Sequence, residues 1–218
     1  MAELLKTGDG SLTVYDPETG DRYHSVHGAI QESQFIYIGC GLNYLQRDSA
    51  SIFEAGFGTG LNALLSCLRS SDTRIRLTYT AIEKKPLGSG VIEKLNYPEM
   101  LTGEAGIIFD RIHSCPWGAP AEITDKFTLF KIKGDLLTYP LTNIYDLIYF
   151  DAFGPEKQPE MWTDDVFRKI SGITVSGSVL VTYSVKGNVK RSLRNNGFNL
   201  TLLPGPPGKR QILRAIKI

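Results

Sequence analysis

Four acidic residues each stand at or near the end of an apolar, β-prone run, and together they could form one binding site. They are Glu54, Glu83, Asp135 and Asp151. Carboxylates accept hydrogen bonds from hydroxyl and amino groups, attract cations and take protons from reacting groups. In open α/β sheets, ligands bind beyond the carboxyl ends of the strands, where these four side chains would converge. The pattern therefore predicts a polar ligand site with negative charge.

The first of these acids opens a glycine-rich turn, EAGFGTGLN, which leads directly into an apolar helical pattern. Its glycines, Gly56, Gly58 and Gly60, alternate with other residues. So much glycine weakens the chain's conformational order unless a ligand or another backbone needs the space. A dinucleotide site would need the spacing G-x-G-x-x-G, and Leu61 stands where the third glycine would fall. The spacing therefore disfavours NAD and FAD, and a purely structural turn is the alternative.

The spacing acid-x-G-x-G-x-G is instead the usual first motif of class I methyltransferases, which bind S-adenosylmethionine. The reactive end of this cofactor is positive, so Glu54 is expected to anchor the loop or meet the ammonium group, directly or through water. The ribose of an adenosine cofactor needs an acid about 20 residues after the glycines, and Glu83 follows Gly60 by 23 residues. Asp135 is suitably placed to reach the adenine amino group. The expected cofactor-binding residues are Glu54, Gly56, Phe57, Gly58, Gly60, Asn62, Glu83, Lys84, Asp135 and Asp151.

A more specific pattern is the stretch DLIYFDAFGPEKQPEMWTDDVF over residues 146–167. Together with the glycine turn, AIEKKPL, GDLL, GSVLVTYSVKGNVKRSLRNNGF and the terminal GPPGKRQIL, it resembles the methyltransferase domain of the bifunctional MnmC family. These are the tRNA 5-methylaminomethyl-2-thiouridine biosynthesis proteins. The resemblance runs in order from about Tyr23 to Leu213 and includes HGAIQESQFIYIGCGLNYLQ. It implies that the chain methylates the aminomethyl group on the wobble uridine of certain tRNAs, 2-thiolated or not.

The sequence stops at Ile218, without the FAD-dependent oxidase region of the bifunctional family. The resemblance therefore implies the methylation alone, and we expect a separate enzyme or pathway to supply the aminomethyl tRNA. The alternative function is methylation of a small amine or a protein side chain, and a non-enzymatic adenosine-nucleotide sensor is a third possibility.

Asp151 is the expected catalytic residue. An aminomethyl group is largely protonated at neutral pH, yet only the free lone pair of its nitrogen can attack the sulfonium methyl. Asp151 ends the strand that should lie beside the glycine turn, where its carboxylate could orient the amine and take the proton. Asp before a Gly-Pro segment also commonly caps a turn, which is the alternative role.

Substrate contacts are expected from aromatic and basic side chains. Aromatic residues on segments that converge near the same sheet edge could stack on a flipped-out uracil, with core packing as the alternative. From residue 166 onward the chain has ten Lys and Arg and no acid, whereas residues 1–165 hold 14 basic and 23 acidic residues. This asymmetry predicts a nucleic-acid-facing surface, unless the basic residues are simply solvated. The expected substrate-binding residues are Phe153, Trp162, Tyr183, Lys186, Lys190, Arg191, Lys209 and Arg210.

Strands and helices that alternate along the chain must position these residues. Strands are predicted at 51–54, 76–83, 127–133, 145–151 and 178–184, with helices beginning near Thr59, Pro86, Trp162 and Gly187. Two final β-prone runs, FNLTLLPG and KRQILRAIKI, should pair antiparallel at one edge. The prediction is a class I, Rossmann-like α/β fold with a mostly parallel seven-stranded sheet. Residues 1–48 would form an N-terminal hairpin and helix extension, and residues 49–218 the methyltransferase domain.

Composition excludes several other classes of protein. No apolar run approaches the length of a membrane span and the start of the chain lacks the pattern of a signal peptide, so we expect a cytoplasmic protein. The three cysteines are far apart and form no CxxC pair, which disfavours a disulfide framework or a zinc site. His24 and His27 form an HxxH without a third candidate ligand nearby, so no metal is expected.

Overall fold

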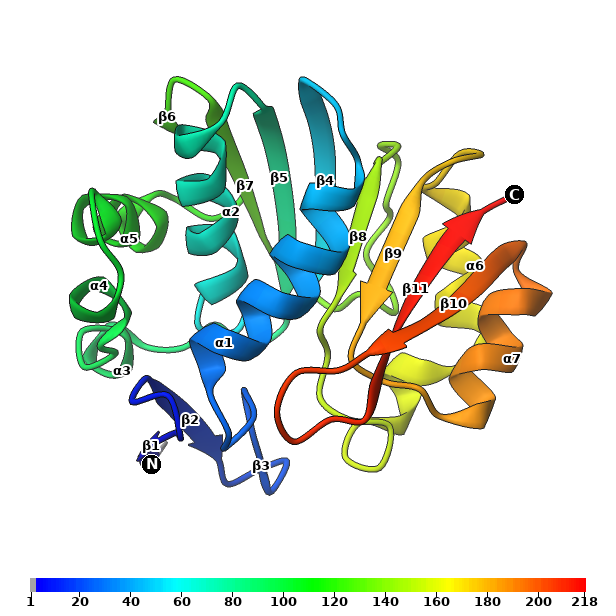
Figure 1. Cartoon of the computed structure of the whole chain (residues 1–218), viewed down its shortest axis with the longest axis horizontal. Coiled ribbons are helices and arrows are strands. Elements are labelled where there is room, and N and C mark those ends of the chain that lie inside the picture. The colour runs from blue at the N-terminus through cyan, green and yellow to red at the C-terminus, as the bar shows by residue number, and fades with distance from the viewer. Residues whose placement is uncertain (1–2) are drawn as a thin grey trace.

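An eight-stranded sheet forms the centre of the computed structural model, which describes residues 3–218 (Figure 1). The strand order is β10-β11-β9-β8-β4-β5-β7-β6. The strands are β4 (Ser49–Ala55), β5 (Arg76–Glu83), β6 (Pro120–Thr124), β7 (Phe127–Lys133), β8 (Leu147–Phe150), β9 (Val179–Thr182), β10 (Phe198–Pro204) and β11 (Gln211–Lys217). The five predicted parallel strands, β4, β5, β7, β8 and β9, are all present within two residues of their predicted bounds.

Antiparallel strands complete both edges of this sheet. The predicted C-terminal hairpin is confirmed, because β10 pairs with β11 and β11 pairs with β9, both antiparallel. At the other edge β6 pairs antiparallel with β7, so the sheet has eight strands and the prediction of seven was wrong. The sequence of β6, PAEIT, gives no clear strand signal, because it starts with proline and buries the side chain of Ile123 alone.

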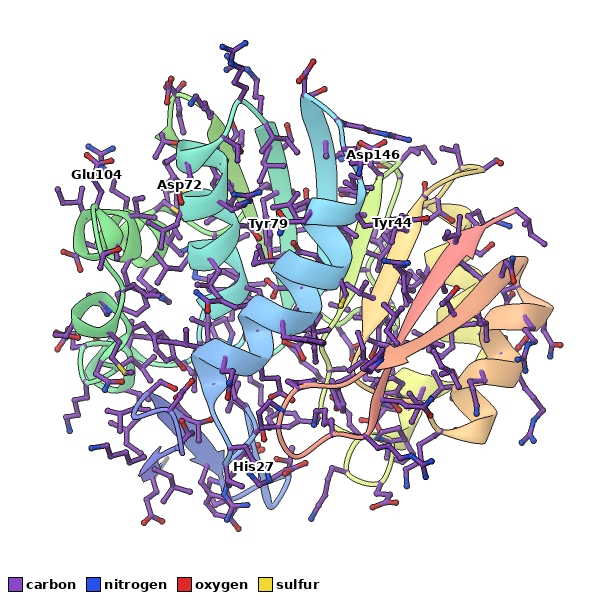
Figure 2. The ribbon with its side chains drawn as sticks, in the orientation of Figure 1. His27, Tyr44, Asp72, Tyr79, Glu104 and Asp146 are labelled. Atoms are coloured by element: carbon purple, nitrogen blue, oxygen red, sulfur yellow. The ribbon has the colours of Figure 1, made fainter. Side chains whose placement is uncertain are left out.

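Helices cover both faces of the sheet (Figure 1). On one face lie α1 (Ala29–Ser33), which continues as the π-helical turns η1 (Gln34–Gly41) and the 3₁₀ turn η2 (Leu42–Tyr44), α2 (Leu61–Asp72) and α5 (Ala105–Ser114), with the short helices α3 (Ser89–Ile92) and α4 (Tyr97–Met100) nearby. On the other face lie α6 (Asp164–Gly172), which follows the 3₁₀ turn η3 (Pro159–Trp162), and α7 (Gly187–Asn195). Two apolar cores result, one under each helical layer. Figure 2 shows the side chains that fill these spaces, the fully buried Tyr79 of β5 among them.

The helix predicted near Thr59 is present as α2, and the helix predicted near Gly187 is α7. The helix predicted near Pro86 is shorter than expected, since α3 has four residues, and α5 was not predicted. The start of α6 follows capping rules: the Thr163 hydroxyl accepts a hydrogen bond from the amide of Val166, and two aspartates occupy the first turn. This cap fixes where α6 begins after the long loop that follows β8.

The N-terminal residues form a second, three-stranded sheet of β1 (Glu3–Lys6), β2 (Leu12–Asp16) and β3 (Asp21–Arg22). The predicted N-terminal hairpin is β2 with β3, which the turn DPETG joins, whereas β1 was not predicted. Figure 1 shows this sheet at the bottom of the molecule, beyond the carboxyl ends of the parallel strands. Ile36 and Tyr37 of η1 are buried in the same core as α2. The division at residue 48 stays a prediction, and the segment before it supplies part of the main helical layer.

Candidate functional site

A cleft of ≈ 620 Å³ opens at the carboxyl ends of the parallel strands. The N-terminal sheet closes one side of it, and His27 in Figure 2 lies at this end of the molecule, opposite Asp146 at the amino end of β8. The predicted residues that line the cleft are Gly56, Gly58, Glu83, Lys84, Asp135, Asp151, Phe153, Tyr183 and Lys209. The predicted residues outside its lining are Glu54, Phe57, Gly60, Asn62, Trp162, Lys186, Lys190, Arg191 and Arg210.

The glycine turn connects β4 to α2 along the floor of the cleft. Gly56 has φ 92°, and a Cβ atom there would lie 2.8 Å from the carbonyl oxygen of Asp151. Gly58 has φ 50°, and a Cβ atom there would lie 2.8 Å from the ring of Tyr23. Both positions favour glycine for their backbone conformation and for the close approach of another part of the chain. Gly56 and Gly58 therefore let the glycine turn pack between the loop after β8 and the N-terminal segment. They also leave the backbone of this turn at the cleft surface.

Gly56→Ala is expected to destabilise the fold by about 1–3 kcal/mol, the usual range for a residue forced into a sparsely populated backbone conformation. The new methyl group would also press on the backbone of Asp151. Urea denaturation measures the effect. Gly172→Ala is the matched control, because no atom lies within 4 Å of its Cβ position and its φ is not positive. Equal stability of both variants would contradict the assignment of strain to Gly56.

Asp151 is held by two hydrogen bonds that leave it at the cleft surface. Its Oδ1 accepts a hydrogen bond of 2.6 Å from the Tyr37 hydroxyl, and its Oδ2 accepts one of 2.8 Å from Nδ2 of Asn62. The same nitrogen of Asn62 donates to Oε1 of Glu54 at 2.9 Å. A chain of Tyr37, Asp151, Asn62 and Glu54 thus runs beneath the glycine turn and fixes the orientation of the Asp151 carboxyl group.

Burial raises the pKa of Asp151 to about 7, with a further rise from the charge of Glu32, while the hydrogen bonds from Tyr37 and Asn62 act in the opposite direction. A carboxyl group with this pKa exchanges its proton readily at neutral pH, as a general base or acid must. Burial likewise raises the pKa of Glu54 well above its usual value. Glu54 is 0% exposed and lies below the loop, so the structure supports its predicted anchoring role and not a direct ligand contact.

Glu83 and Asp135 lie side by side at the ends of β5 and β7. Glu83 accepts hydrogen bonds from the amides of Gly58 (3.1 Å) and Lys85 (2.9 Å), so it supports the glycine turn while it faces the cleft. Nζ of Lys84 lies 2.8 Å from Oδ2 of Asp135. This hydrogen bond and the charge of Lys84 hold the pKa of Asp135 below its usual value, so that its carboxylate is ionised at neutral pH.

Phe57, Gly60 and Asn62 act from behind the cleft wall. The Phe57 ring is 4% exposed and packs edge-on against His113 and Trp117. Gly60, with φ 73°, lets the chain turn into α2. These three residues are buried outside the cleft lining and shape the site from behind, and their cofactor contacts stay a prediction.

The predicted aromatic contacts divide into two groups. Phe153 and Tyr183 line the cleft, and the Tyr183 hydroxyl donates a hydrogen bond of 2.7 Å to the carbonyl of Ala152. Trp162 is only 2% exposed, and its Nε1 donates a hydrogen bond of 2.7 Å to the carbonyl of Phe153. Trp162 therefore supports the loop after β8 from the core side. Its ring is packed in the apolar core, so the structure does not support the prediction that it stacks on a base.

The predicted basic residues also differ in place. Lys209 points into the cleft, where its Nζ lies 2.9 Å from Oε1 of Glu32. Lys186 pairs with Glu156 on the surface. Lys190 and Arg191 lie on α7 and Arg210 is exposed in the turn before β11, and for residues 3–218 none of these three forms a salt bridge.

The N-terminal segment supplies cleft residues that sequence reasoning missed. Tyr23 and Glu32 line the cleft, and the Tyr23 ring packs edge-on against Phe153 with centroids 5.0 Å apart. Tyr37 was missed as the partner of Asp151. A signal was available, because a tyrosine in an otherwise apolar helical run needs a partner for its buried hydroxyl.

Two absences concern the described part of the chain. In residues 3–218 no group of three or more His, Cys, Asp or Glu side chains could hold a metal ion, and the three cysteines are free. Over the same residues, no helix has both the length and the apolar character needed to cross a membrane.

Comparison with known proteins gives consistent matches. Residues 121–218 match a family described as S-adenosyl-L-methionine-dependent methyltransferase. The bifunctional tRNA 5-methylaminomethyl-2-thiouridine biosynthesis protein MnmC of Cupriavidus metallidurans is 33% identical over 97% of this chain and 33% of its own length. That of Magnetococcus marinus is 32% identical over 94% of this chain and 32% of its own length. The chain thus spans about a third of the length of these curated relatives.

A solved structure agrees over the whole fold. The crystal structure of MNMC2 from Aquifex aeolicus superposes with a TM-score of 0.79 at 26% identity, and covers 99% of this chain and 70% of that one. The mixed sheet, the glycine turn after β4 and the acids beyond β5, β7 and β8 are the features of a class I fold in which S-adenosylmethionine is the cofactor. The chain is therefore an MnmC-like methyltransferase domain, similar to the S-adenosylmethionine-dependent methyltransferases.

Proposed function

We propose that this protein is an N-methyltransferase that converts 5-aminomethyluridine, with or without a 2-thio group, to 5-methylaminomethyluridine at the wobble position of tRNA. The observation that carries the proposal is Asp151: an oriented carboxyl group with a pKa of about 7, in a cleft beside the glycine turn. The names of the MnmC relatives support the same substrate. A tRNA substrate would place the reaction in the cytoplasm, and a preceding reaction would supply the aminomethyl group.

The residues that line the cleft fit S-adenosylmethionine. The Glu83 carboxylate can accept from both ribose hydroxyls, and the ionised Asp135 can accept from the adenine amino group. Gly56 and Gly58 present backbone to the cleft without side chains that would fill it. When bound, the cofactor supplies a methyl group on a positively charged sulfonium, next to which a carboxylate is favourable.

Asp151 would act on the substrate amine. One ammonium proton passes to a carboxylate oxygen of Asp151, which leaves a lone pair on the nitrogen. The free lone pair could then accept the methyl group that the bound cofactor would supply, leaving the cofactor as its neutral thioether and the substrate as a secondary ammonium. Tyr37 and Asn62 hold the carboxylate still, so the amine is kept in line with the reacting bond, which accounts for much of the rate in such displacements.

The uracil ring would lie against aromatic side chains at the cleft mouth. Phe153 and Tyr183 are the two predicted aromatic residues that line the cleft, from loops after β8 and β9. A wobble base must leave the anticodon stack to reach Asp151, and aromatic faces compensate for the lost stacking. We infer that these two rings, and not Trp162, receive the base.

The basic residues Lys190 and Arg191 of α7 would contact tRNA phosphates. Charge reversal in the pair Lys190→Glu and Arg191→Glu is expected to weaken tRNA binding and lower its salt dependence, because fewer counterions are then released. Cofactor affinity should stay nearly unchanged, since neither residue lines the cleft. Filter binding at two salt concentrations measures the effect.

The matched control is the pair Arg74→Glu and Arg76→Glu. It changes the net charge by the same amount at the amino end of β5, away from the cleft. If both pairs weaken tRNA binding equally, overall charge and not the α7 surface accounts for the affinity.

Methylation of a small amine or a protein side chain remains the second candidate. It is favoured by the engagement of two predicted phosphate ligands, Lys186 and Lys209, in salt bridges with Glu156 and Glu32. Mass spectrometry of wobble nucleosides from cells that lack the protein separates the two functions. The proposal predicts that aminomethyluridine accumulates and methylaminomethyluridine is lost, whereas an unchanged nucleoside profile would favour the small-substrate function.

A further inference from the structure

A second carboxylate, that of Glu32, lines the same cleft as Asp151 and is already in contact with an ammonium group. Glu32 of α1 is 9% exposed, and its Oε1 lies 2.9 Å from Nζ of Lys209. The same Nζ lies over the ring of Tyr183, 4.9 Å from its centroid. Glu32, Tyr183 and Lys209 all line the cleft with Asp151. We call these three residues the ammonium pocket.

Glu32 is built to hold a cation at this place. Its Oε2 accepts a hydrogen bond of 2.9 Å from the amide of Ser25, which fixes the side chain. Its Oε1 is buried and, despite the short distance to Lys209, has no well-directed hydrogen bond. A buried carboxylate oxygen without a directed donor is costly, so a better-placed donor would be favoured there.

The group that now fills the pocket has the chemistry of the proposed substrate. The end of a lysine side chain is a primary ammonium on a methylene carbon, and so is the protonated aminomethyl group on uridine C5. Carboxylate contact together with an aromatic face is a general mode of binding for such a cation. Both contacts would hold the substrate nitrogen in the cleft that Asp151 also lines.

Lys209 lies where its side chain can leave without disturbing the sheet. It belongs to the turn 205–210 between β10 and β11, outside both strands. The turn is closed by its own backbone bonds, from the amide of Lys209 to the carbonyl of Pro206 and from Gly205 to Arg210. Departure of the ammonium therefore breaks the contacts with Glu32 and Tyr183 and leaves the hairpin pairing intact.

We propose that Glu32 and the face of Tyr183 bind the ammonium group of the substrate, and that Lys209 occupies this place in the free enzyme until the substrate displaces it. The proposal rests on the proposed function, because that function supplies the amine. It gives Lys209 a role opposite to the phosphate contact predicted from sequence: Lys209 competes with the substrate for Glu32.

Kinetics of methylation of aminomethyl tRNA distinguish the two roles by the sign of the effect. Lys209→Met keeps the length of the side chain and removes its charge, so KM for the tRNA is expected to fall about fivefold with kcat nearly unchanged, the size expected when one partly buried ion pair with a cation-π contact no longer competes. A phosphate ligand would instead give a higher KM. Arg210→Met, one residue further along the same turn, is the comparison, and its KM should rise. A KM that is unchanged or higher in Lys209→Met overturns the proposal.

Glu32→Gln tests the other half of the pocket. The KM for aminomethyl tRNA is expected to rise about tenfold or more, because the charged acceptor for the ammonium is lost. The double variant Glu32→Gln with Lys209→Met leaves no unpaired charge and serves as a folded form if the single variant unfolds. It should retain the high KM, and a KM equal to that of the unchanged protein would overturn the role of Glu32.

A binding experiment separates failure of this proposal from failure of the proposed function. Calorimetry with S-adenosylhomocysteine present uses the nucleoside 5-aminomethyluridine as probe and its neutral analogue 5-hydroxymethyluridine as control. Lys209→Met should bind the amine more tightly than the neutral nucleoside, and the double variant should lose this preference. If the unchanged protein does not methylate tRNA but this preference is seen, the proposed substrate is wrong and the pocket stands. If no preference is seen, the pocket is wrong whatever the tRNA result.

Discussion

Asp151→Asn is expected to lower the rate of methylation by about a hundredfold or more, the range for loss of a positioned acid-base group. The amide cannot take the ammonium proton. It also replaces one acceptor oxygen by a donor, so that Tyr37 or Asn62 loses its partner. Higher pH should restore part of the rate, because a larger share of the amine is then already free. Single-turnover rates with saturating cofactor, from about pH 6 to pH 9, measure the effect.

Tyr37→Phe is the control variant, because it keeps the carboxylate and removes one hydrogen bond to it. That bond lowers the pKa of Asp151, so its loss should raise the pKa above the value of about 7. The base must be deprotonated to act, and the acidic limb of the pH-rate profile should therefore move to higher pH. Parental rates for Asp151→Asn across the whole pH range would show that this aspartate only caps a turn.

Glu83→Ala is expected to weaken the binding of S-adenosylmethionine and S-adenosylhomocysteine by about 1.5–3 kcal/mol, roughly ten- to 150-fold, the range for hydrogen bonds to a charged group. Two ribose hydroxyls would lose their acceptor. The amide of Gly58 would lose its acceptor as well, so the glycine turn is less well held. Calorimetry measures the affinity, and the thermal midpoint without ligand reports the loop effect separately.

Glu122→Ala is the matched control for this loss of charge, because Glu122 is exposed on the edge strand β6 and lies outside the cleft lining. Its affinity should equal that of the unchanged protein. NAD should bind neither variant nor the parent, since the glycine spacing lacks the third glycine of a dinucleotide site. Tight NAD binding, or equal cofactor affinity in Glu83→Ala, would overturn the assignment of the adenosine end.

The strands β8 and β9 could be predicted because each is a short apolar run, rich in β-branched or aromatic residues, in which every residue is buried. The acids that follow such runs were predicted to meet, and Glu83, Asp135 and Asp151 do line one cleft. β6 was missed because an edge strand needs no such apolar run and this one begins with proline.

Contacts between segments far apart in the chain could not be predicted from the sequence. The hydrogen bond from Tyr37 to Asp151 joins residues 114 positions apart: the apolar run around Tyr37 signals that its hydroxyl needs a partner, but no local pattern says which residue that is. The N-terminal segment was expected to be an appendage, yet Tyr23 and Glu32 form part of the cleft wall. Conversely, Trp162 stands in the most specific motif, but burial decides that it supports the loop and does not face a base.

The most direct test of the account is methyl transfer by the purified protein. S-adenosylmethionine with a labelled methyl group is mixed with tRNA that carries aminomethyluridine at the wobble position, and with the same tRNA carrying unmodified uridine. We expect label in the wobble nucleoside of the first tRNA, located by mass spectrometry on the nitrogen of its side chain, and none in the second. Failure to label the aminomethyl tRNA, under conditions in which the protein binds the cofactor and methylates a small amine or a protein, would contradict the proposed function.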